Sequence, residues 1–204
     1  MPPWRVDPHN GVVGVEVAVP RDDGAAAHLP GRRLPAVGLA ATDGSTVDLS
    51  ALGPGRTVLY VYPKTGRPGV EPPPEWDRIP GARGCTPEAC GFRDHHDALR
   101  QAGARVYGLS SQTTDDQREA VERLRLPYPL LADPQLAVGR ALGLPTFVAG
   151  GETFYRRLTM IARDGVVEHV FYPVFPPDTH AAEVLAWLTS DGRGRPGAAA
   201  RPGR

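Results

Sequence analysis

The chain has 204 residues, and its 23 lysines and arginines are balanced by 23 aspartates and glutamates. This length allows one domain with a well-buried core, and the balanced charge gives no electrostatic reason to expect nucleic acid or an anionic membrane as a partner. Two cysteines are too few for a secreted disulfide scaffold, and neither a signal-peptide pattern nor an apolar run of membrane length occurs. We therefore expect a soluble, cytoplasmic protein.

The first part of the chain predicts an extension, a β-hairpin and a buried strand. Residues 1–28 form the extension and hold one β-like run, at 12–19, which could add an edge strand. The hairpin is expected at 34–49, because an Asp-Gly turn separates two short apolar runs. The buried strand is expected at 57–62, where the residues are apolar, β-branched or aromatic.

Beyond this strand, helices and strands alternate. The expected elements are a helix from Pro87 to about Gln101 with Thr86 as its N-cap, a strand at 105–110, a helix from Thr113 or Thr114 to Leu124, a strand at 128–132, a helix from Asp133 to about Leu142, strands at 157–161 and 166–171, and a last helix from Asp178 through Trp187. The alternation predicts an α/β fold, with a central mixed β-sheet and helices on both faces. We assign residues 29–190 to this domain and residues 191–204 to a disordered tail, which has nothing to bury.

Both cysteines lie close together, five positions apart, where the helix at 87–101 is expected to begin. Gly81 and Gly84 precede Cys85 and give the backbone the freedom to turn several N–H groups toward its sulfur. The positive end of the helix dipole lies at the same place. Such surroundings lower a thiol pKa from about 8.5 toward roughly 3.5–7.5, so that the thiolate predominates at neutral pH. The sequence therefore predicts that Cys85 is a nucleophile.

The second cysteine, Cys90, lies on a more polar face of the expected helix than Cys85 does. Two residues five positions apart on an unbroken helix have Cα atoms roughly 8–9 Å apart. A disulfide tolerates a Cα separation of only about 4.4–6.8 Å. A bond between Cys85 and Cys90 would therefore require the first helical turn to unwind, which indicates a redox cycle with a conformational step.

The run Gly84-Cys-Thr-Pro-Glu-Ala-Cys-Gly-Phe-Arg-Asp94, with Val58-Leu-Tyr-Val-Tyr-Pro-Lys64 before it, resembles the bacterioferritin-comigratory, or PrxQ-like, peroxiredoxins. The similarity covers roughly residues 29–189 and implies a thioredoxin-like fold and a thiol peroxidase that reduces hydrogen peroxide and organic hydroperoxides. It makes Cys85 the peroxidatic and Cys90 the resolving cysteine of an intrachain disulfide, which a thioredoxin-type reductant would reopen. It implies no cofactor and no metal, and a monomer or homodimer.

The sequence departs from the family pattern beside the reactive cysteine. The pattern requires Pro at position 78 and Thr at position 82, whereas this chain has Arg78 and Ala82. An additional segment, 65–79, also lengthens the active-site loop. Family members place a Thr or Ser hydroxyl against the sulfur, and we predict that Thr65 supplies it here. Thr86 is the rival donor, although its hydroxyl is expected to be occupied in capping the helix.

The active-site arginine of the family has two candidates here, Arg156 and Arg157, at the start of the strand at 157–161. Strand alternation sends their side chains to opposite faces of the sheet, so only one can reach the site. The Arg-x-Thr pattern selects Arg157, whereas a gapless alignment from Asp164 selects Arg156; we favour Arg157. Glu88 is expected either to orient that arginine or only to favour the helix N-terminus.

Other interpretations of the two cysteines stay open. They could be inert core thiols, since free cysteine is often buried and unreactive. They could bind zinc with His95 and His96, although the spacing does not match a zinc knuckle. The chain could also be a redox-sensing or partner-binding protein with little peroxidase turnover, as the alanine at position 82 would allow. A dithiol oxidoreductase is disfavoured, because no Cys-x-x-Cys motif occurs.

Overall fold

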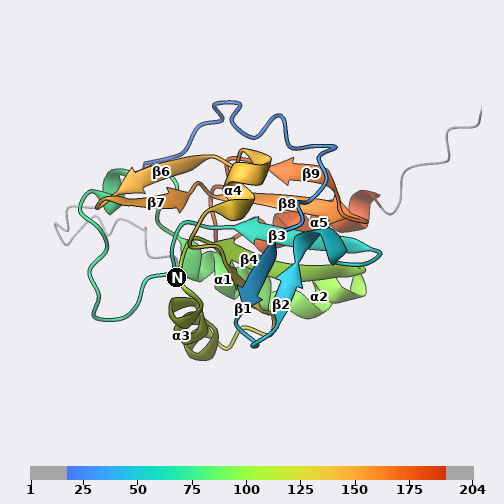
Figure 1. Ribbon diagram of the computed structural model, residues 1–204, viewed down its shortest axis with the longest axis horizontal. Coiled ribbons are helices and arrows are strands. Elements are labelled where there is room, and N and C mark those ends of the chain that lie inside the picture. The colour runs from blue at the N-terminus through green and yellow to red at the C-terminus, as the bar shows by residue number, and fades with distance from the viewer. Residues whose placement is uncertain (1–17, 192–204) are drawn as a thin grey trace, which may run out of the picture.

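The computed structural model describes residues 18–191, and Figure 1 shows a central sheet with helices around it. The strands of this sheet are β1 Gly38–Ala41, β2 Thr46–Asp48, β3 Arg56–Val61, β4 Ala104–Ser110, β5 Leu130–Ala132, β8 Leu158–Arg163 and β9 Val166–Phe171. Their order is β2-β1-β5-β4-β3-β8-β9. β4 runs parallel to β3 and β5, whereas the other neighbours are antiparallel. The predicted mixed sheet is confirmed.

Helices cover both faces of the sheet, as predicted. They are α1 Cys85–Asp94, α2 His96–Gln101, α3 Thr114–Leu124, α4 Ala137–Leu142 and α5 His180–Asp191, with short 3-10 turns η1 Leu49–Ala51 and η2 Trp76–Arg78. Strand β3 divides the core because successive side chains of a strand point to opposite faces. Val58 and Tyr60 join the core under α1, α2, α3 and α5, whereas Leu59 and Val61 join the core under α4.

A short hairpin lies outside the main sheet, at residues for which the sequence predicts no element. β6 Thr146–Ala149 pairs with β7 Glu152–Tyr155. The turn between them contains Gly150 and Gly151, which both have positive φ. Figure 1 shows the hairpin beside the loop that contains η2. Phe154 of β7 packs against Trp76 of that loop, whereas the neighbouring Tyr155 joins the core under α4.

The helix predicted at 87–101 is in fact two helices, α1 and α2. They are separated at His95, where φ is −100° and ψ is 1°. α1 also begins earlier than predicted, at Cys85, so the prediction of Thr86 as N-cap is wrong. Gly84 takes that place with a left-handed backbone, φ 102°, and offers no side-chain cap. The sulfur of Cys85 therefore lies within the first turn itself.

Two other predicted helix starts have different outcomes. Thr113 caps α3 as expected, because its side chain accepts a hydrogen bond from the backbone N–H of Asp116. The prediction of Asp178 as the cap of the last helix is wrong. α5 begins at His180, and the N–H groups of its first turn bond to the carbonyl oxygen of Thr179.

The ends of the chain leave two predictions without a test. Most of the β-like run at 12–19 lies outside the described residues, and residues 18 and 19 form no strand. The predicted tail at 191–204 also lies outside them, apart from Asp191, which ends α5. Within residues 18–191, no helix has the length and apolar character needed to cross a membrane.

Gly84→Ala should destabilise the fold more than Gly55→Ala does. The two glycines have φ of 102° and 100°, so either alanine incurs left-handed backbone strain of about 1–2 kcal/mol. A Cβ on Gly84 would also lie 2.3 Å from Cγ of Pro177, whereas one on Gly55 would meet nothing within 4 Å. We expect this overlap to cost Gly84→Ala about 1–3 kcal/mol more. Urea unfolding measures the difference, and equal losses would contradict the close packing of Pro177 on the helix start.

Candidate active site

Cys85 is the first residue of α1 and is buried, with 3% of its surface exposed. Its sulfur lies 3.6 Å from the carbonyl oxygen of Ala82, in the turn before the helix. β3 runs toward the same place, and the backbone N–H of Lys64, just beyond that strand, lies near enough to the sulfur to lower the pKa of the thiol. The start of α1 and the end of β3 therefore hold the sulfur between them.

A buried guanidinium reaches the sulfur from a third element. Arg157 directly precedes β8, and its Nη2 lies 3.1 Å from Sγ of Cys85. The same Nη2 donates to the carbonyl oxygens of Gly81 and Arg83, at 3.3 and 3.1 Å. Arg157 thus fixes both the sulfur and the turn that precedes it.

The neighbouring arginine points away from this site. Arg156 is exposed, and its guanidinium pairs with the carboxylate of Asp23 at 3.3 Å. The two arginine side chains leave opposite sides of an extended backbone, as strand alternation requires. Of the two candidates, Arg157 is therefore the one that contacts the cysteine.

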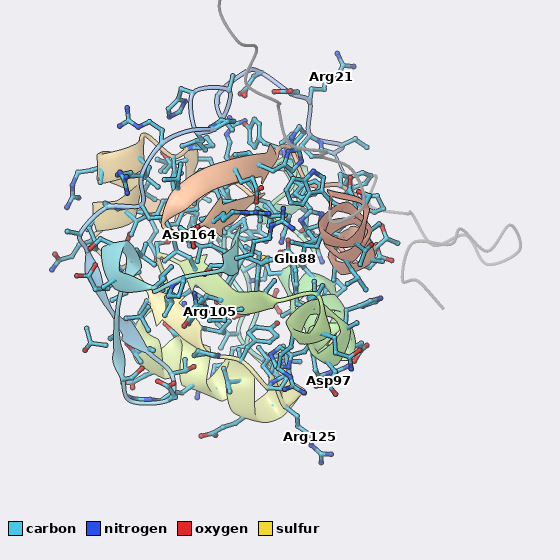
Figure 2. All side chains as sticks on the ribbon, turned by 90° about the vertical axis from the view of Figure 1, so that its right-hand side faces the viewer. Arg21, Glu88, Asp97, Arg105, Arg125 and Asp164 are labelled. Carbon is cyan, nitrogen blue, oxygen red and sulfur yellow. The ribbon has the colours of Figure 1, made fainter. Side chains whose placement is uncertain are left out.

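Glu88 lies one turn after Cys85 and is completely buried. Figure 2 shows it inside the molecule, whereas Arg21 and Arg125 project from the surface. Its Oε2 forms an ion pair with Nη1 of Arg157. Burial raises the pKa of Glu88 to about 7, against the opposing effect of the guanidinium. Glu88 therefore contacts the arginine directly, in addition to its place near the helix N-terminus.

The structure contradicts the predicted low pKa of Cys85. Burial raises the pKa of this thiol above its ordinary value; Arg157 opposes the effect and Glu88 reinforces it. The backbone N–H of Lys64 also lowers the pKa. The sequence indicates the donors and the helix dipole. It does not indicate how completely the fold removes water from the sulfur, or that a carboxylate shares its arginine.

Thr65 bonds to Gln112 and not to Cys85, contrary to the prediction. Its Oγ1 donates to Oε1 of Gln112 at 3.0 Å, and its backbone N–H donates to the same oxygen at 2.8 Å. The Gln112 amide donates in return to the Thr65 carbonyl oxygen at 3.3 Å. The hydroxyl proton is therefore engaged away from the sulfur, and Gln112 fixes the backbone next to Lys64. Gln112 is 47 residues away in the chain, so no local pattern reveals it.

The additional segment 65–79 packs beside the turn that precedes the cysteine. Trp76 is buried against Phe147 and Phe154 of the β6–β7 hairpin, with ring centroids 5.6 and 5.0 Å apart. Ala82 belongs to the same apolar cluster. A methyl group therefore packs against aromatic rings where the family pattern has a hydroxyl.

Cys90 is half-buried and lies on the same unbroken helix as Cys85, and both are free thiols. Residues five apart on a helix are roughly 8–9 Å apart at Cα, so a disulfide between them needs this part of α1 to unwind. The hydroxyl of Tyr128 donates to the carbonyl oxygen of Ala89 at 2.8 Å, between the two cysteines. Unwinding must therefore break or move this contact.

The two histidines of the zinc interpretation have other neighbours. Nδ1 of His95 lies 2.9 Å from the carbonyl oxygen of Gly91, one turn earlier in the helix. The ring of His96 lies against that of Tyr128, with centroids 5.8 Å apart. These contacts give no support to a zinc site that includes the cysteines.

Known proteins are similar to this chain over most of its length. The Redoxin family model matches residues 29–185. Chloroplastic peroxiredoxin Q of Suaeda salsa is 32% identical over 156 residues, which are 76% of this chain and 65% of that protein. Chloroplastic peroxiredoxin Q of Sedum lineare is 31% identical over 149 residues, which are 72% of this chain and 71% of that protein. The chain belongs to the PrxQ-like peroxiredoxins.

Solved structures agree with the fold of this peroxiredoxin. Peroxidoxin BcpB from Mycobacterium tuberculosis is 29% identical, with a TM-score of 0.64 over 79% of this chain and 96% of that one. Peroxiredoxin Q from Xanthomonas campestris is 25% identical, with a TM-score of 0.62 over 77% of this chain and 94% of that one. The predicted thioredoxin-like fold is confirmed. The matched part of this chain spans 65%, 58% and 61% of three plant relatives.

Thr65→Val should leave the pKa of Cys85 unchanged, because the lost hydroxyl bonds to Gln112 and not to the sulfur. The variant should lose only about 1 kcal/mol of unfolding free energy, since Gln112 Oε1 keeps the backbone N–H of Thr65 as a partner. The pH dependence of Cys85 alkylation, in a Cys90→Ser background, measures the first effect, and urea unfolding measures the second. A raised thiol pKa would show that the Thr65 hydroxyl acts on the sulfur after all.

Proposed function

We propose that this peroxiredoxin is a thiol peroxidase that reduces hydrogen peroxide and organic hydroperoxides. The observation that carries the proposal is the 3.1 Å contact between Nη2 of Arg157 and Sγ of Cys85, in a buried site. A fixed cation and a backbone N–H both face the sulfur. Donors fixed in this way stabilise a thiolate, and they also stabilise charge that develops on an oxygen atom next to it.

In the first step, the Cys85 thiolate attacks the terminal oxygen of the peroxide. An S–O bond forms as the O–O bond breaks, so that sulfur becomes sulfenic acid while hydroxide or alkoxide leaves and takes up a proton to give water or an alcohol. Arg157 and the N–H of Lys64 are in place before the reaction, so they can stabilise the charge that moves from sulfur to oxygen. Glu88 holds the guanidinium from its other side.

In the second step, the thiol of Cys90 condenses with the sulfenic acid at Cys85. A disulfide forms and water is released. The helical distance between the two residues requires α1 to unwind between these two steps. A thioredoxin-type dithiol then reduces the disulfide by thiol–disulfide exchange, which restores both thiols and oxidises the partner.

A redox sensor with little peroxidase turnover is the second candidate. Two observations favour it: Ala82 places a methyl group where the family has a hydroxyl, and burial raises the pKa of Cys85. Both would slow the reaction with peroxide, because less thiolate is present and one donor is missing. A sensor reacts with one equivalent of peroxide and then stops, whereas a peroxidase consumes many equivalents.

The cellular location and the assembly of the chain remain predictions. The names of the plant relatives call them chloroplastic, and that location applies to those proteins. For this chain we keep the cytoplasm as the expected location and a monomer or homodimer as the expected state.

With thioredoxin, thioredoxin reductase and NADPH, the parent protein should consume many equivalents of hydrogen peroxide. Cys85→Ser should consume none. Cys90→Ser should react once and then accumulate sulfenic or sulfinic acid at Cys85, which mass spectrometry can locate. A first oxidation at Cys90 would contradict the assigned roles. Consumption that stops after one equivalent in the parent would favour the sensor.

A further inference from the structure

The buried site contains one cation and two acidic groups. Nη2 of Arg157 contacts the sulfur of Cys85, and Nη1 contacts Oε2 of Glu88. Within the described residues, Oε1 of Glu88 and Nε of Arg157 have no hydrogen-bond partner. The guanidinium is therefore the single charged partner that the geometry gives to either acid.

Among residues 18–191, the groups that face this trio bring no second positive charge. Tyr60, Tyr62 and Tyr128 face Glu88 and remain neutral, because burial raises the pKa of each phenol. His180 faces Arg157, and burial lowers the pKa of its imidazole, which also favours the neutral form. If Cys85 and Glu88 were both ionised, the interior would hold an uncompensated negative charge. Such a charge is costly in a site without water, and one of the two acids takes a proton instead.

We propose that Cys85 and Glu88 share one proton, so that the thiolate forms as Glu88 becomes a neutral acid and the charge of Arg157 then stabilises the sulfur. Only the consequence for peroxide reduction rests on the proposed function. Glu88 is thus a positioning residue, because it holds Arg157. Its protonation state also decides whether the positive charge of Arg157 is balanced by Glu88 or by the sulfur of Cys85.

Peroxide reduction needs one proton, and Glu88 can supply it. When the Cys85 thiolate attacks, an S–O bond forms, the O–O bond breaks, and hydroxide or alkoxide leaves. Sulfur is oxidised and its negative charge disappears, while the leaving oxygen takes up one proton. Glu88 releases one proton at the same stage, because Arg157 then needs an anion as its partner. The trio of cysteine, glutamate and arginine therefore carries no net charge before or after the step.

Alkylation of Cys85 by iodoacetamide tests the shared proton without peroxide. The rate is measured against pH in a Cys90→Ser background for the parent, for Glu88→Gln and for Glu168→Gln. Glu168→Gln is the control. It removes a carboxylate that pairs with Arg56 at 2.9 Å, at the opposite end of β3 from the site. Two acids that share a proton interact by more than about one pK unit, so Glu88→Gln should lower the apparent pKa of Cys85 by at least about that much. Glu168→Gln should not change it.

The direction of this shift separates two roles of Glu88. If the carboxylate only held Arg157 in place, Glu88→Gln would weaken the contact between guanidinium and sulfur and raise the pKa of Cys85. A raised or unchanged pKa would therefore overturn the shared proton.

A second measurement leaves Glu88 intact. Infrared difference spectra are recorded before and after alkylation of Cys85 at neutral pH. Alkylation removes that fraction of Cys85 which is thiolate, so the matching fraction of protonated Glu88 should lose its carboxyl band while a carboxylate band grows, and neither change should occur in Glu88→Gln. No loss of a carboxyl band in the parent would overturn the proposal. Neither experiment uses peroxide, so a failure of the peroxidase assay would refute the proposed function and leave these results interpretable.

Discussion

The contact between the Arg157 guanidinium and its buried partners is the constraint on which the site depends. A buried guanidinium depends on acceptors for most of its donors, and removal of one partner of a buried ion pair costs about 3–5 kcal/mol. Here the acceptors come from the turn at Gly81 and Arg83, from the sulfur of Cys85 and from Glu88. The arginine enters from the start of β8 and therefore joins the turn and α1 to the sheet.

Helix α1 has to satisfy two opposing requirements. Its helical form places Cys85 against the arginine, yet the proposed disulfide with Cys90 would require its first part to unwind. The contacts along α1 are divided accordingly. Its second half is fixed by apolar packing, where Phe92 stacks on Tyr60 with centroids 4.5 Å apart. Between the cysteines, the hydrogen bond from Tyr128 to Ala89 is a polar contact that can be exchanged for water. The first turn can therefore open while the remainder stays packed.

The sequence predicts those features that depend on local pattern. The apolar run at 57–62 predicts β3, and the cysteines, the glutamate and the arginine pair are visible as motif residues. Features that depend on contacts between distant segments are not visible in this way. The partner of Thr65 is Gln112, 47 residues away, and the β6–β7 hairpin packs on Trp76 from the additional segment. The raised pKa of Cys85 likewise follows from its burial, which only the complete fold determines.

The second-order rate constant for oxidation of Cys85 by hydrogen peroxide, measured by stopped flow in Arg157→Met and Arg156→Met, tests the central claim most directly. The two arginines are adjacent in the chain, but one contacts the sulfur and the other pairs with Asp23 at the surface. Arg157→Met should slow the reaction by about 10²–10³-fold, because it removes a donor aimed at the transition state. Arg156→Met should react at nearly the parent rate. Similar rates for the two variants, or a larger loss in Arg156→Met, would contradict the account.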